Sequence, residues 1–155
     1  GAVPMVLGPF LGIPKAFELE DQEFQYSLFF HDGDFLKNRV PMEALKHNIP
    51  LIAEPLSNPP EEGKSRMSFL SVSPDHFMLK VLKISEEGNS IILRIFNTLD
   101  DTSTGIITLD KKLKNVNLVN LLENPFKQLD LIDDHSFEFE SRPLEILTFS
   151  LMLSS

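Results

Sequence analysis

The densest group of side chains that could do chemistry is His31-Asp32-Gly33-Asp34. A histidine and two carboxylates that follow a strand could bind a cation or hydrogen-bond a sugar. The same residues are typical of a turn, because aspartate and glycine favour turns and an aspartate side chain can cap the next segment. The turn is the favoured interpretation, and His31, Asp32 and Asp34 are kept as candidates for contact with a substrate. The remaining ligand positions of an EF-hand loop are absent.

The other histidines lack the spacing of a metal site. None belongs to an H-E-x-x-H pair, and no histidine is followed two positions later by aspartate. Metal ligation would therefore need partners that the fold brings together, and we predict no metal site. The adjacent acids Asp133-Asp134 and Asp100-Asp101 are interpreted as turns. Since no nucleophile elbow, phosphate-binding glycine loop or dinucleotide fingerprint occurs, we name no catalytic residue.

Two polar residues and the aromatic composition favour structure over ligand binding. Arg94 and Asn97 lie on or just after an aliphatic strand, where a structural hydrogen-bonding role is expected. The chain has 13 Phe, one Tyr and no Trp. Sugar-binding sandwiches usually stack their ligands on exposed Trp or Tyr, whereas Phe prefers the core. A free-standing carbohydrate-binding module is therefore disfavoured.

Composition and charge narrow the class of protein. The chain has 155 residues, is 42% hydrophobic, and carries 23 acidic against 14 basic residues for a formal net charge of -9. Such a surface repels phosphate backbones and anionic lipids, so nucleic acid and membranes are not expected partners. No apolar run approaches the roughly 18 residues of a membrane span. The absence of cysteine fits a reducing compartment, and we expect a cytoplasmic location.

The elements that must position these residues are mainly strands. From residue 67 onward the pattern is uniformly typical of strands, and turn residues such as Glu87-Gly88-Asn89 separate the runs. The predicted fold class is mainly β, an antiparallel β-sandwich with one short helix. The eight predicted strands are 67–73, 76–85, 89–97, 105–110, 115–122, 125–132, 136–141 and 144–153.

The part before residue 57 is more irregular. Residues 23–30 (EFQYSLFF) alternate and predict a strand, and residues 49–55 predict another. Residues 41–48 predict a short helix, since proline suits the first turn. Residues 1–14 are apolar but broken by proline and glycine, so their side chains should pack on this domain or on something else.

The sequence predicts a linker at residues 57–66. This stretch (SNPPEEGKSR) contains two prolines, a glycine and no large apolar side chain. We therefore expect an N-terminal segment, residues 1–56, that packs on the sandwich. Residues 67–155 are expected to form the sandwich itself.

Several passages resemble glycoside hydrolase family 38, the α-mannosidases. SFLSVSPDHFMLKVLKISEEGNSIILRIFN is similar to a family passage in which a SFLxVxP strand precedes a lysine-containing strand, an acidic glycine turn and a strand ending in asparagine. VNLVNLLENPFKQLDL and SRPLEILTFSL are similar to the family's ending. FQYSLFFHDGDF and HNIPL resemble marks of its bacterial and cytosolic members. The likeness covers residues 23–153, with Thr98 in place of a common proline and Leu144 in place of a usual phenylalanine.

The resemblance implies a C-terminal β-region without the catalytic machinery. In that family a separate barrel carries the nucleophilic aspartate and a His-x-Asp zinc motif, which this sequence lacks. The expected function is a non-catalytic C-terminal β-domain that supports this barrel, with zinc only in the parent's catalytic domain. The parent would hydrolyse α-mannosides with retention, so its catalytic domain and mannose-containing glycans are the expected partners. A homo-oligomer through exposed apolar surface, and an independent carbohydrate- or protein-binding module, remain alternatives.

Overall fold

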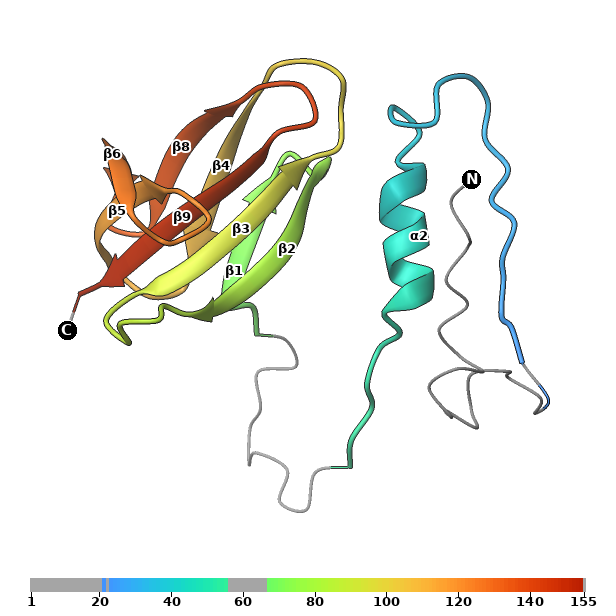
Figure 1. Cartoon of the computed structure of the whole chain (residues 1–155), viewed down its shortest axis with the longest axis horizontal. Helices are drawn as coiled ribbons and strands as arrows, with labels where there is room; N and C mark the ends of the chain where they lie inside the picture. The colour runs from blue at the N-terminus through green and yellow to red at the C-terminus, as the bar shows by residue number, and fades with distance from the viewer. Residues whose placement is uncertain (1–20, 22, 56–66, 155) are drawn as a thin grey trace, which may run out of the picture.

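The computed structural model describes residues 21, 23–55 and 67–154. The predicted linker 57–66 and the apolar stretch 1–14 lie outside these residues. Within them, one helix precedes nine strands (Figure 1): α2 (Val40–Asn48), β1 (Leu70–Ser73), β2 (Phe77–Ile84), β3 (Ile91–Asn97), β4 (Ser103–Leu109), β5 (Leu113–Val119), β6 (Pro125–Leu129), β7 (Leu131–Asp133), β8 (Ser136–Ser141) and β9 (Ile146–Leu153).

The strands form two antiparallel sheets, which confirms the predicted sandwich. One sheet has four strands in the order β1-β4-β8-β7, and the other has five in the order β2-β3-β9-β5-β6. The inward positions of β4 and β8 alternate with exposed ones, as expected for a sheet with one face on a core. No helix among the described residues has the length and apolar character needed to cross a membrane.

The core lies between the sheets and is rich in phenylalanine. Phe137 and Phe139 of β8 meet Phe149 of the other sheet, each with ring centroids 5.3 Å from it. Phe77 of β2 packs its ring on Phe139 edge to face at 4.9 Å. These contacts bury large apolar areas of both sheets. The burial of this surface is the main contribution that holds the sheets together.

The predicted strand 125–132 is in fact two strands. Residues 125–129 pair with β5 in the five-stranded sheet, and residues 131–133 pair with β8 in the other sheet. The chain changes sheets at Asp130, a corner of the kind that sandwiches use. Leu129 and Leu131 both pack against the core. The alternation therefore continues through the corner, and the sequence pattern does not show where one strand ends and the next begins.

The predicted strands 23–30 and 49–55 are wrong, because neither segment is in a strand. Phe24, Tyr26 and Phe30, which would share one face of the predicted strand, are 81%, 85% and 89% exposed. Alternation alone does not make a strand, since each strand needs a partner for its backbone hydrogen bonds. None of the described residues pairs with 23–30.

The predicted helix is confirmed as α2. It begins at Val40, with Pro41 in its first turn, and contains no buried residue. Arg39 precedes it in the left-handed region at φ 58°. The Arg39 guanidinium pairs with the Asp75 carboxylate at 2.6 Å, next to the start of β2.

Candidate functional site

The His31-Asp32-Gly33-Asp34 loop is a capped turn on the surface. All four residues are exposed, and Gly33 has a positive φ of 77°. One Asp34 carboxylate oxygen accepts hydrogen bonds from the Leu36 and Lys37 backbone N–H groups, at 2.9 and 3.0 Å. The carboxylate thus caps the turn that leads toward α2, as the favoured interpretation of the sequence expected.

The candidate residues of this loop do not converge on a common point that could hold an ion. The His31 ring lies beside the Phe29 ring, with centroids 6.5 Å apart. Across residues 21, 23–55 and 67–154, no three His, Asp or Glu side chains are grouped so that they could hold a metal. Contact of His31, Asp32 and Asp34 with a substrate stays a prediction.

The Asp133-Asp134-His135 turn is structural, as expected. The Asp133 carboxylate accepts hydrogen bonds from the His135 backbone N–H at 2.7 Å and from the Ser136 hydroxyl at 2.6 Å. These bonds, the Ser136 hydroxyl first, hold the pKa of Asp133 below its usual value. The Asp134 carboxylate pairs with the Lys112 ammonium at 2.8 Å.

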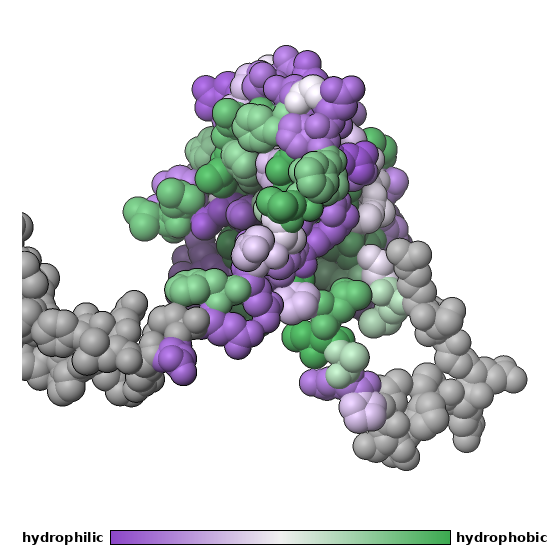
Figure 2. All heavy atoms as spheres, turned by 90° about the vertical axis from the view of Figure 1, so that its right-hand side faces the viewer, coloured by the Kyte–Doolittle hydropathy of each residue, from purple (hydrophilic) through white to green (hydrophobic). Residues whose placement is uncertain are grey.

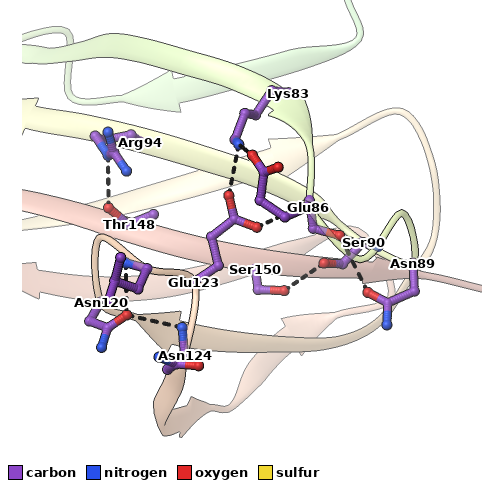
Figure 3. A network of polar contacts seen from close by, with 12 residues as sticks. Lys83, Glu86, Asn89, Ser90, Arg94, Asn120, Glu123, Asn124, Thr148 and Ser150 are labelled. Carbon is purple, nitrogen blue, oxygen red and sulfur yellow. Dashed lines mark hydrogen bonds and ion pairs between the residues drawn. The ribbon is translucent and has the colours of Figure 1, made fainter.

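A polar hollow on the outer face of the five-stranded sheet was missed by the sequence analysis. It encloses about 300 Å³ between the turn that joins β2 to β3 and the turn that joins β5 to β6. Ile92, Asn117 and Ser150 lie side by side beneath it, because Ser150 is the register partner of both other residues. The turn residues 85–90 and 122–125 form its walls (Figure 3).

Glu123 ties the two walls together. Its carboxylate accepts a hydrogen bond from the Glu86 backbone N–H at 2.8 Å and pairs with the Lys83 ammonium at 2.8 Å. Lys83 also pairs with the Glu86 carboxylate. Figure 3 shows the Glu123 side chain reaching from its own turn toward the β2–β3 turn. The side chain is only 13% exposed, so this contact is partly shielded from water.

The ion pair between Glu123 and Lys83 favours the charged form of both side chains. The hydrogen bond to Lys83, followed by that from the Glu86 backbone, lowers the pKa of Glu123. The hydrogen bonds to Glu123 and then Glu86 raise the pKa of Lys83. Glu123 itself has a φ of 66°, a left-handed conformation that a residue with a side chain adopts at a cost of about 1 kcal/mol. The backbone is thus held in a strained form at the residue that joins the walls.

Smaller hydrogen bonds shape each wall. The Asn120 side-chain oxygen accepts from the Leu122 and Asn124 backbone N–H groups, at 2.9 and 3.0 Å. The Ser150 hydroxyl bonds the Ser90 hydroxyl at 2.9 Å, which links β9 to the β2–β3 turn. The hollow is therefore a built surface rather than a gap between mobile loops.

The signal for this hollow in the sequence is weak and scattered. Its residues come from three stretches, 85–92, 117–125 and 150. Asn117 and Ser150 are polar residues at the outward positions of strands whose inward positions are apolar. Outward polar residues occur on every sandwich, so only the pairing of β5 with β9 shows that these two meet.

Arg94 and Asn97 have the structural roles expected of them. The Arg94 side-chain Nε donates to the Thr148 hydroxyl at 3.0 Å on the same outer face (Figure 3). Asn97 is fully buried, and its side chain hydrogen-bonds to three backbone groups. Both residues therefore join parts of the sandwich rather than offering groups to a ligand.

His76 is the one described residue with a buried side-chain atom that lacks a hydrogen-bond partner, its ring Nε2. Burial lowers the pKa of this histidine, Asp75 opposes the shift, and Arg39 adds to it. Because the folded state then takes up a proton less readily than the unfolded state, the free energy of unfolding should fall as the pH drops below the ordinary value of 6.5.

We expect His76→Phe to reduce this loss of stability between about pH 7.5 and about pH 5.5, where carboxylates scarcely titrate. Urea unfolding at both pH values measures the change in the free energy of unfolding. His31→Gln, at an exposed histidine, should keep the pH dependence of the original chain. If His76→Phe keeps it too, the burial of His76 has no energetic consequence.

The described structure is thus an antiparallel β-sandwich domain with a hollow on one outer face. Residues 76–149 match the family model described as "Glycosyl hydrolases family 38 C-terminal beta sandwich domain". The match runs from just before β2 into β9 and so covers both sheets except β1. Over residues 76–149 the sandwich is therefore similar to the C-terminal β-sandwich domain of glycosyl hydrolase family 38, and the resemblance seen in the sequence is confirmed for these residues. No curated protein matches the chain.

Proposed function

We propose that this chain is the non-catalytic C-terminal β-domain of an α-mannosidase, in which it supports the catalytic barrel. The observation that carries the proposal is the family match at residues 76–149, which lie in the sandwich. The parent would hydrolyse α-mannosides. A cytoplasmic location and self-association through apolar surface remain predictions of the same hypothesis.

Exposed apolar side chains support packing against another part of the parent. Leu28, Leu51 and Ile52 are 76%, 101% and 89% exposed, although their types favour burial. Figure 2, in which the right-hand side of Figure 1 faces the viewer, shows hydrophobic residues exposed among hydrophilic ones. Contiguous apolar patches of several hundred Å² usually mark interfaces, so residues 23–55 are the segment that we assign to the contact with the parent.

The family implies a zinc ion in the catalytic domain. The described residues do not fit it, because they hold no suitable group of three His, Asp or Glu side chains. We therefore assign zinc to the parent's catalytic domain and derive no step through it here.

The test uses the purified 155-residue chain with 4-nitrophenyl α-D-mannopyranoside, with and without added Zn²⁺. We expect no turnover above a buffer control and no stoichiometric zinc by elemental analysis. The gene should encode, upstream in the same reading frame, a domain with a His-x-Asp motif. Turnover that copurifies with the chain, or about one zinc per chain, would overturn the non-catalytic role. A reading frame without such a domain would favour an independent binding module.

A further inference from the structure

We propose that the hollow between the β2–β3 and β5–β6 turns binds one neutral sugar residue. The site lies in the sandwich itself, so it goes beyond the supporting role and does not depend on it. Its volume of about 300 Å³ is at the lower end of the range for small-molecule sites. A single ring, rather than an extended oligosaccharide, is the matching size.

The hollow offers hydrogen-bonding groups that the protein does not use. Within the described part of the chain, the side-chain amides of Asn117 and Asn124 make no hydrogen bond, and each can donate twice and accept. The Ser90 and Ser150 hydroxyls bond each other and keep further capacity to donate and accept. Neighbouring hydroxyls of a sugar both donate and accept, so they suit amides and hydroxyls placed side by side.

Apolar atoms lie next to these polar groups. Val119, Leu122 and Pro125 line the same hollow, and the Leu122 side chain is 80% exposed. A sugar ring has C–H faces as well as hydroxyl edges. Covering Leu122 with such a face would remove apolar surface from water, which stabilises a complex in proportion to the area covered.

The charges favour a neutral ligand over an anion or a metal. Glu86, Glu87 and Glu123 line the hollow, and the nearby Lys83 ammonium is paired with two of these carboxylates. A phosphate or sulfate would therefore meet net negative charge. A divalent cation lacks a set of three acidic or histidine ligands in the described residues. A carboxylate, in contrast, accepts strong hydrogen bonds from sugar hydroxyls.

The walls are fixed before any ligand arrives. The bonds of Glu123 to Lys83 and to the Glu86 backbone hold the two turns at a set separation. A preformed site loses less conformational entropy on binding, which partly offsets the small number of contacts that one sugar can make. We expect a dissociation constant in the range of about 1–10 mM.

The experiment is a titration of the ¹⁵N-labelled 155-residue chain with methyl α-D-mannopyranoside, followed by NMR. We expect saturable shifts confined to residues 85–92, 117–125 and 150. Methyl α-D-glucopyranoside distinguishes a general hexose site from a mannose-selective one, and both results support the proposal. Inorganic phosphate should give no saturable shift at these residues.

Matched variants test the assigned groups. Asn117→Ala should weaken binding at least about fivefold, the loss expected for one or more hydrogen bonds. Ser150→Ala should also weaken it and serves if the first variant does not fold. Asn115→Ala is the control, because Asn115 lies two residues earlier on the same face of β5 but does not line the hollow.

Three outcomes would overturn the sugar site: no saturable shift, shifts elsewhere on the chain, or binding by Asn117→Ala equal to that by Asn115→Ala. Saturable phosphate shifts in the hollow would overturn the assignment to a neutral ligand. None of these outcomes affects the proposed role in an α-mannosidase, which rests on the family match and is tested by turnover and by the reading frame.

Discussion

Asn97→Ala should lower the free energy of unfolding by about 3 kcal/mol, one of the two largest effects expected for a single substitution in this chain. The Asn97 side chain is fully buried at the end of β3. Its amide nitrogen donates to the backbone carbonyls of Asp101 and Arg142, at 3.0 and 2.9 Å. Its oxygen accepts from the Leu99 backbone N–H at 3.0 Å. All of its hydrogen-bonding groups are therefore used.

The cost arises from the groups that alanine leaves behind. The two carbonyls belong to the β3–β4 and β8–β9 turns, so Asn97 joins turns at the same end of both sheets. A buried polar group that loses its partner costs about 1–3 kcal/mol. Urea unfolding monitored by circular dichroism measures the change.

Two further variants separate the causes of the loss. Asn97→Asp keeps the acceptor for Leu99 but removes both donors and buries a carboxylate, so it should destabilise at least as much as alanine. Asn115→Ala, at a partly exposed asparagine of β5, should change stability by less than about 0.5 kcal/mol. Equal small losses at positions 97 and 115 would show that the buried network contributes little.

The strands of the sandwich were predictable because a sheet with one buried face imposes a period of two. Phe137 and Phe139 on β8 and Leu147, Phe149 and Leu151 on β9 follow this period and form the core. Residues 23–30 have the same period but form no strand. This difference shows that an alternating pattern is not sufficient for a strand. A strand also needs a neighbouring strand to pair with, and the pattern of one segment does not show whether such a neighbour exists.

The candidate site was less predictable than the fold for a related reason. The His31–Asp34 cluster is contiguous, so the sequence displays it directly, and its turn chemistry was also predictable from the residue types. The hollow is made by Glu86, Asn117, Glu123 and Ser150, which only the order of strands in the five-stranded sheet brings together. No local pattern distinguishes Glu123 from an ordinary glutamate in a turn. Its role in joining the two turns depends on an ion pair with Lys83, which lies 40 residues earlier in the sequence.

Gly105→Ala should lower the free energy of unfolding by about 2–3 kcal/mol, because it overpacks the core. Gly105 of β4 is the register partner of Phe139 on β8. A Cβ at Gly105 would lie 2.3 Å from the Phe139 ring and 2.7 Å from the Phe77 ring. Both rings are buried, at 4% and 3% exposure, and pack on each other. They have little room to move aside.

A smaller partner ring should relieve the clash, so Phe139→Leu is the natural second substitution. Alone, it should destabilise by removing part of the contact among Phe77, Phe139 and Phe149. Combined with Gly105→Ala, the total loss should be smaller than the sum of the two single losses by about 1 kcal/mol, because leucine frees the space that the new methyl group needs. Thr104→Ala, on the exposed face of β4, should cost less than about 1 kcal/mol. Strict additivity would mean that the backbone, rather than the Phe139 ring, limits the residue at 105.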